Sequence, residues 1–143
     1  MNDLHAGRLL LLADALQTKI PDAQFYFGSI TRGNPKHLIN FFGTFGSYEC
    51  KSVACAIGWC PIVFPKLFEY VFGGIVEIGK PDSIASSFHA VMAPFGISFG
   101  EVEHLFCPTR YPDGDRTNRL QVAARIRSFV ASKQESNDGK VSC

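Results

Sequence analysis

Residues 3–18 read DLHAGRLLLLADALQT, and this stretch does most to decide the fold class. Asp3 suits the N-cap position of a helix, and the leucines and alanines that follow make the helix apolar on most sides. Pro21 ends it, because proline cannot continue a helix. A helix that is apolar nearly all round is usually buried. We therefore expect a central helix that runs to about Thr18.

The composition predicts one small globular domain. The chain has 143 residues, of which 46% are hydrophobic and 19% charged, and its net charge is +1. This near-neutral charge disfavours nucleic acid as a partner, and no apolar run approaches the ~20 residues of a membrane helix. Five cysteines without an export-signal pattern predict free thiols in the cytoplasm. The domain is expected over residues 1–132, followed by a polar, flexible tail at residues 133–143.

Helix caps, prolines and glycines predict where the other helices and strands begin and end. Ser98 and Glu101 have capping-box spacing and predict a helix that stops at Pro108, and Thr117 suits the cap of a last helix. The aromatic and glycine-rich residues 25–48 predict loops or short strands. Other helices are expected at 50–60 (stopped by Pro61), 65–72 and 82–93 (capped by Asp82 and ended by Pro94 and Gly96), with a short strand at 75–78. The sequence thus predicts an α+β, mostly helical, single compact domain of about six helices with an aromatic insertion.

Several of these stretches resemble a family of small uncharacterised proteins from bacteria and their phages. That family has a leucine-rich first helix, an aromatic F-x-M-x-x-W-like segment, a C-G-T-x-x-C-x-x-G-[WH] motif, F-G-[LI]-[ST] before a helix ending in L-F-x-P, and a V-A-x-R-I helix. The corresponding stretches here are residues 9–16, 25–29, 50–59 (CKSVACAIGW), 95–98, 105–108 and 122–126. Lys51 and Ser52 stand where the motif has Gly-Thr, and the family's Met and Trp in the preceding aromatic segment are missing. The resemblance informs the fold and implies no catalytic residue.

Cys50 is the candidate nucleophile. It lies where the predicted second helix begins, beside Lys51, and both features lower the pKa of a thiol. The segment also looks distantly like the cysteine helix of papain-like peptidases and amidases, for which His89 is the best candidate base. The competing interpretation is core packing or helix capping for Cys50, and core packing for Cys55.

No metal or cofactor site is expected from the sequence. Cys50, Cys55 and Cys60 have C-x4-C-x4-C spacing, and helical residues five apart differ in direction by ~140°, so they do not converge on one ion. The chain also lacks GxxxxGK[ST] and G-x-G-x-x-G phosphate-binding patterns.

Arginines gather near the start of the last helix. A helix N-terminus binds anions, and arginine recognises phosphate or carboxylate through its forked guanidinium. Helix geometry predicts that Arg125 points away from this region. The competing interpretation is a solvated helix with local ion pairs to neighbouring aspartates. The residues expected to contact an anion are Arg110, Arg116, Thr117 and Arg119.

Three functions follow from these patterns. The first is a non-catalytic accessory protein that binds a small anionic ligand, such as a nucleotide, or a protein partner. The second is a cysteine-dependent hydrolase that uses Cys50 and His89. The third is an interaction module that docks through the phenylalanine-rich residues 41–48.

Overall fold

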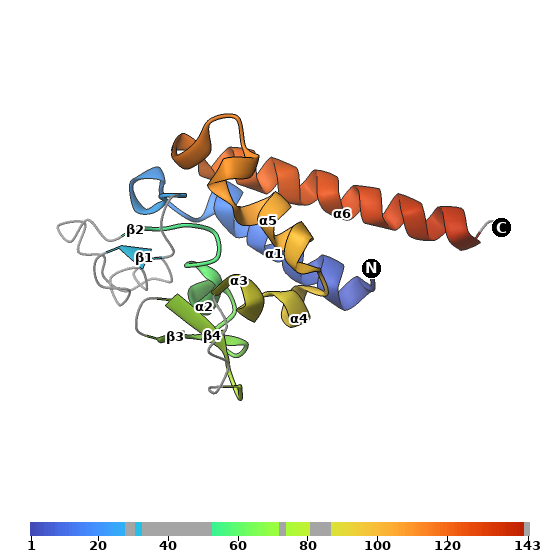
Figure 1. Ribbon diagram of the computed structural model, residues 1–143, viewed down its shortest axis with the longest axis horizontal. Coiled ribbons are helices and arrows are strands. Elements are labelled where there is room, and N and C mark those ends of the chain that lie inside the picture. Colours follow the sequence, from blue (N-terminus) through green and yellow to red (C-terminus); the bar gives the residue numbers. More distant parts are fainter. Residues whose placement is uncertain (28–30, 33–52, 72–73, 81–86, 142–143) are drawn as a thin grey trace.

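The fold is a mostly helical α+β domain, as the sequence predicted (Figure 1). The computed structural model describes residues 1–27, 31–32, 53–71, 74–80 and 87–141. Within them, short 3₁₀ turns occur at Asp22–Gln24, Pro108–Arg110 and Gly114–Arg116. The helices and strands are α1 (Asp3–Thr18), β1 (Thr31–Arg32), β2 (Val53–Ala54), α2 (Cys60–Val63), β3 (Phe68–Val71), β4 (Gly74–Glu77), α3 (Ser87–Ala90), α4 (Met92–Phe95), α5 (Phe99–Phe106) and α6 (Arg119–Val141).

Helix α1 lies at the centre, as its composition predicted. It runs antiparallel to α6 and packs against α2 and α4 on its other side (Figure 1). Its cap differs from the prediction, because the side chain of Asn2, and not Asp3, accepts the His5 N–H at 2.8 Å. Asp3 is the first helical residue, where its negative charge still suits the helix dipole.

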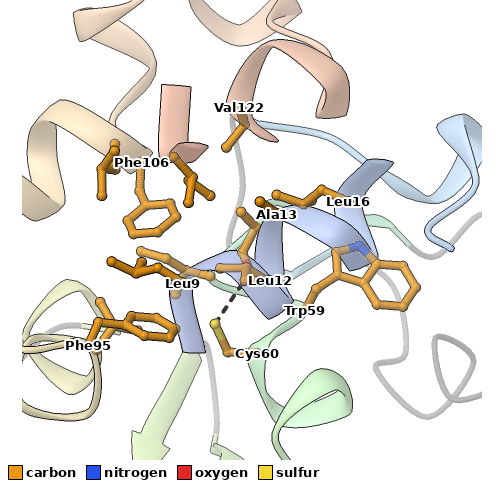
Figure 2. Close-up of a cluster of buried hydrophobic side chains, with 14 of the residues drawn as sticks. Leu9, Leu12, Ala13, Leu16, Trp59, Cys60, Phe95, Phe106 and Val122 are labelled. Carbon is orange, nitrogen blue, oxygen red and sulfur yellow. Dashed lines mark hydrogen bonds between the residues drawn. The ribbon is translucent and has the colours of Figure 1, made fainter. Parts of the chain in front are cut away.

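The core surrounds α1 (Figure 2). Leu9, Leu12 and Leu16 have no exposed surface, and they lie between Phe106 and Val122 on one side and Trp59 on the other. Full burial of one leucine side chain contributes roughly 1.5–3 kcal/mol. Because α1 contributes side chains to both sides, it joins the α5–α6 layer to the layer that contains α2 and the hairpin.

The helix predicted over residues 50–60 is wrong where the structure describes it. Val53 and Ala54 form β2, which pairs antiparallel with β1, and residues 56–59 form turns. Pro61 does not stop a helix but lies in the first turn of α2, where its missing N–H costs no hydrogen bond. A short apolar run does not distinguish helix from turn or strand by periodicity alone, which explains the error.

The helix predicted over residues 65–72 is also wrong. Phe68–Val71 is β3, and it pairs with β4 in an antiparallel hairpin in which Val71 lies opposite Gly74. Aromatic and β-branched residues such as Phe68, Tyr70 and Val71 favour a pleated strand, and Phe68 faces the core with 1% of its surface exposed. The strand predicted at residues 75–78 is confirmed as β4.

The helix predicted over residues 82–93 is described only from Ser87. It is split into α3 and α4, and Pro94 lies inside α4, in the first turn where proline is tolerated. The predicted cap, Asp82, lies outside the described residues. Gly96 ends α4 in the left-handed conformation, with φ +63°. Arg8 of α1 donates to the Pro94 carbonyl at 2.8 Å, which fixes this helix end against α1.

Helix α5 begins as predicted. Ser98 accepts the Glu101 N–H at 3.2 Å, and the Glu101 carboxylate accepts the Ser98 N–H at 2.9 Å. Helix α6 has 23 residues and runs to Val141, through most of the segment predicted to be a flexible tail. The flexibility of residues 133–143 stays a prediction. None of the helices in the described part of the chain has both the length and the apolar character needed to cross a membrane.

The Gly96 turn yields a stability prediction. A Cβ at position 96 would overlap the imidazole of His5, and the left-handed conformation itself costs a non-glycine residue about 1–2 kcal/mol. We therefore expect Gly96→Ala to destabilise the protein by at least about 1 kcal/mol in urea unfolding.

Gly7→Ala is the matched control. Gly7 is an exposed residue inside α1, and a Cβ there would have no atom within 4 Å. This change should stabilise the protein by about 0.5–1 kcal/mol, the ordinary gain of alanine over glycine in a helix. Equal effects of the two substitutions would contradict the assigned geometry of Gly96.

Candidate functional site

A cavity of about 420 Å³ lies at the start of α6. The chain segment after α1 forms one wall, and the residues that lead into α6 form the other. Three of the four residues expected to contact an anion line it, and Arg110 does not. The lining consists of Asp22, Phe25, Tyr26, Asp115, Arg116, Thr117, Asn118, Arg119 and Leu120.

Among the residues that the structure describes, Arg116 is the cation of this cavity whose guanidinium has no partner. It belongs to the exposed 3₁₀ turn before α6, and its guanidinium has no hydrogen bond or ion pair within the described residues. The N–H groups of Arg119 and Leu120, in the first turn of α6, likewise have no acceptor among those residues. A free guanidinium beside free helix N–H groups is a combination that favours an anionic group.

The cap predicted at Thr117 is wrong, and Asn118 takes that role. The Asn118 side chain accepts the Gln121 N–H at 2.9 Å, and the Gln121 side chain accepts the Asn118 N–H at 2.8 Å. Thr117 is buried, and its hydroxyl donates to the Gly114 carbonyl at 2.6 Å. Thr117 therefore closes the turn that presents Arg116, and its hydroxyl proton is already committed.

Arg119 lines the cavity with a guanidinium that is already engaged. Its NH1 donates to the carbonyls of Leu16 and Gln17, each at 2.8 Å, at the C-terminal end of α1. Its Nε lies 2.6 Å from the Asp22 carboxylate. These bonds satisfy carbonyls that a helix end leaves without an intrahelical donor. Arg119 thus fixes the two walls of the cavity relative to each other.

Arg110 and Arg125 lie away from this cavity. Arg110 belongs to the turn after α5, and Arg125 belongs to α6. The Arg110 guanidinium is 3.8 Å from the Glu103 carboxylate of α5. Arg125 is half-buried, donates to the carbonyls of His104 and Arg110, and stacks over the ring of Tyr111 at 3.7 Å. Arg125 therefore points away from the α6-start cavity, as the helix phase predicted, but it is engaged with other parts of the chain and not simply solvated.

Phe25 and Tyr26 form the aromatic part of the cavity wall, and the sequence did not single them out. Both are half-buried, and they follow the Asp22–Gln24 turn that Arg119 anchors. The pairing of Asp22 with Arg119 joins residues 97 positions apart, so no local pattern reveals it. The sequence signals here were the high aromatic content of residues 25–48 and the likeness of residues 25–29 to the family's aromatic segment, and neither indicated which residues meet the arginines.

The described residues that line the cavity have a formal charge of zero. Arg116 and Arg119 are balanced by Asp22 and Asp115. Asp22 is paired with Arg119, which leaves Arg116 and Asp115 as neighbours of any ligand. A cavity of this charge suits a ligand with a single anionic group better than a polyanion.

The structure describes only part of the site that the cysteine hypothesis requires. Cys50, as well as residues 41–48 of the interaction hypothesis, lies outside the described residues. His89 is exposed on α3, with its ring stacked on Phe99 at a centroid distance of 4.7 Å. Cys55 and Cys60 are free thiols buried in the core, as packing predicted for Cys55.

Burial also controls the chemistry of these two thiols. Loss of hydration raises the pKa of Cys55 to about 11, against weaker lowering by backbone hydrogen bonds around Gly58. Burial first, and then the proximity of Cys55, raise the pKa of Cys60. Neither thiol is activated as a nucleophile near neutral pH.

Comparison of the chain with protein-family models, curated proteins and solved structures finds no match. The resemblance described above therefore stays a prediction. Within the part of the chain that the structure describes, no three His, Cys, Asp or Glu side chains gather as a metal site would require.

Arg119 and Arg116 should differ in their effect on stability. Arg119→Ala removes two bonds to helix carbonyls and the pair with Asp22, so we expect it to destabilise the protein by roughly 1.5–3 kcal/mol. Arg116→Ala should change stability by less than about 0.5 kcal/mol, because the side chain is exposed and unpaired within the described residues. Chemical unfolding of both variants measures the difference, and equal losses would refute these assignments.

Alkylation of the native protein tests the cysteine assignments. At pH 7.5, iodoacetamide should modify the half-buried Cys107 well before Cys55 and Cys60, whose buried thiols stay protonated. Peptide mass spectrometry gives the rate at each site. Modification of Cys55 as fast as that of Cys107 would contradict its burial. Rapid modification of Cys50 is what the hydrolase hypothesis requires, and slow modification would remove that hypothesis.

Proposed function

We propose that this protein is a small non-catalytic accessory protein that binds a small anionic ligand in the cavity at the start of α6. The observation that carries the proposal is that one cavity is lined by Phe25, Tyr26, the first turn of α6 and Arg116, whose guanidinium has no partner among the described residues. The cytoplasmic location and the bacterial or phage origin rest on the sequence alone and are part of the proposal.

The two walls of the cavity suit two parts of one ligand. Arg116 and the N–H groups of Arg119 and Leu120, which have no acceptor within the described ranges, offer donors to an oxyanion. Phe25 and Tyr26 offer apolar ring surface on which a flat heterocycle stacks favourably. A nucleotide combines these two parts, and a cavity of about 420 Å³ falls within the usual range for small-molecule sites.

The charge of the lining narrows the ligand class. Asp115 is exposed, has no partner among the described residues, and lies in the same lining as Arg116. Each phosphate beyond the first brings more negative charge toward this carboxylate. We therefore propose a nucleoside monophosphate, or a compound of similar charge and shape, in preference to a triphosphate.

Calorimetry tests the proposal. Wild-type protein is titrated with AMP, GMP, CMP and UMP, with each nucleoside as the uncharged counterpart, and with each nucleoside triphosphate. We expect at least one monophosphate to bind more tightly than its nucleoside and its triphosphate. Arg116→Ala should weaken that binding by roughly 1.5–3 kcal/mol, or about tenfold to more than a hundredfold, as for other hydrogen bonds to charged groups.

Arg127→Ala is the matched control. Arg127 is exposed on α6, does not line the cavity, and donates to the Gln17 side chain at 2.9 Å. Arg127→Ala removes the same charge as Arg116→Ala. If the contact with Arg116 is specific, the affinity of the Arg127→Ala variant for the monophosphate should stay within about twofold of wild type. If no monophosphate binds, or if both variants lose the same affinity, the proposed function is wrong.

A further inference from the structure

The main chain of β3 points some of its polar groups away from β4. The hairpin of these two strands lies on the side of α1 away from α6 (Figure 1). Tyr70 lies opposite Ile75, whose N–H donates to the Ser87 hydroxyl at 3.0 Å and not to Tyr70. Leu67 does face β4, because its carbonyl accepts the Ile78 N–H at 2.9 Å. Since the residues of an antiparallel strand alternate between its two edges, the N–H and C=O of Tyr70 point to the outer edge.

The two outer edges of the hairpin differ in what covers them. Helix α3 packs against β4 and satisfies its Ile75 N–H through Ser87. At the outer edge of β3, the Phe68 N–H donates to the Phe64 carbonyl at 3.1 Å. The Tyr70 N–H and the carbonyls of Phe68 and Tyr70 have no partner among the described residues. Such an edge is a template for the main chain of one more extended segment.

A groove of about 490 Å³ adjoins β3. Its described lining includes three successive residues of β3, Phe68, Glu69 and Tyr70, and no residue of β4. Because successive side chains of a strand point to opposite faces, a groove that touches all three lies along the strand edge and not over one face. We call it the α2–β3 groove. The rest of its lining is apolar and comes from α2 and the turn that follows, with Pro61, Ile62, Val63 and Pro65.

The β3 side of the groove is held firmly in place. The Tyr70 hydroxyl donates to the Gly58 carbonyl at 2.6 Å. Burial first, and then the two buried core thiols, raise the pKa of Tyr70, so its hydroxyl stays protonated and keeps this bond. Phe68 packs against Phe64 and Phe95, with ring centroids 6.2 and 6.0 Å away. An edge that is already fixed loses little entropy when a further strand is added.

Glu69 determines which occupant suits the groove. It is exposed, its carboxylate has no partner within the described ranges, and the described lining contains no basic side chain. A second copy of this chain matches this charge poorly. A two-fold axis at Tyr70 would put the two Glu69 side chains on diagonal positions of one face, about 7–8 Å apart. A segment that carries a basic residue at this position is complementary instead.

We propose that the outer edge of β3 and the α2–β3 groove bind an extended peptide segment in which two apolar residues flank a basic one. The main chain of the peptide pairs with the outward groups of Tyr70 and Phe68. Its apolar side chains share one face with Phe68 and Tyr70 and enter the groove beside Ile62, and the basic side chain lies on the face of Glu69. This site goes beyond the proposed function, because it shares no lining residue with the cavity at the start of α6.

NMR titration at pH 7 tests the proposal. The probes are acetylated peptide amides of sequence Ser-Thr-X-Z-X-Thr-Ser, in which X is Val, Leu or Phe and Z is Lys, Arg, Thr or Glu. We expect at least one peptide with Lys or Arg at Z to shift the Tyr70 amide saturably and to protect it from hydrogen exchange. The matched peptide with Glu at Z should bind at least about threefold more weakly. If no peptide of the set saturates the Tyr70 shift, the proposal is wrong.

N-methylation of the tightest peptide separates strand pairing from apolar contact alone. Only alternate N–H groups of an added strand face β3. Methylation of these should weaken binding at least about tenfold, whereas methylation of the intervening ones should change it by less than about twofold. A methylation series without this alternation would contradict strand addition.

Charge reversal on the protein tests the role of Glu69. Glu69→Lys changes an exposed side chain, and the variant should prefer the peptide with Glu at Z. Glu135→Lys is the matched control, since Glu135 is exposed on α6 and is not in the groove lining. This control should keep the preference of the wild type for Lys or Arg. The same preference in Glu69→Lys would refute the contact with Glu69.

Hydrogen exchange of the protein without peptide tests whether a second copy covers this edge. We expect the Tyr70 amide to exchange rapidly and the Glu69 amide, which faces β4, to be protected. Sedimentation of the same sample gives its oligomeric state. A dimer in which the Tyr70 amide is already protected would identify the edge as a contact between copies and would overturn the proposal.

Discussion

The guanidinium of Arg119 fixes the geometry on which the α6-start cavity depends. Its NH1 donates to the carbonyls of Leu16 and Gln17 near the end of α1, and its Nε pairs with the carboxylate of Asp22. A half-buried arginine with acceptors on both edges loses much of its freedom, so the start of α6 is fixed relative to the end of α1. The apolar face of α6 then continues the contact, with Val122 and Ile126 buried in the core around Leu12 and Leu16. These contacts between α1 and α6 also set the position of Arg116, because Arg116 lies in the turn just before α6.

Local signals allowed part of the fold to be predicted. The Ser98–Glu101 capping box and the helix end at Gly96 depend on residues only a few positions apart, and both are confirmed. Residues 53–59 and 68–71 were misread because a short apolar run carries no reliable period. There the tertiary context decides. Phe68 becomes a strand residue because β4 pairs with it and the core receives its ring.

The candidate site was predictable in its composition and not in its geometry. The density of arginines near the start of α6 identified the region, and three of the four expected residues line one cavity. The role of each side chain depends on partners that lie far away in the sequence. Arg119 meets Leu16 and Gln17 across more than a hundred residues, and Arg125 meets a carbonyl of α5. A sequence shows the charge and the helix phase, but it does not show which backbone carbonyls lack a donor.

The lining of the α6-start cavity limits how it can discriminate between ligands. Asp115 offsets Arg116, so the cavity combines little net charge with aromatic surface. Discrimination between one base and another therefore has to come mainly from ring stacking and shape. Because Arg119 is anchored to backbone carbonyls of α1, the two walls of the cavity are held together before any ligand arrives, which lowers the entropy cost of binding.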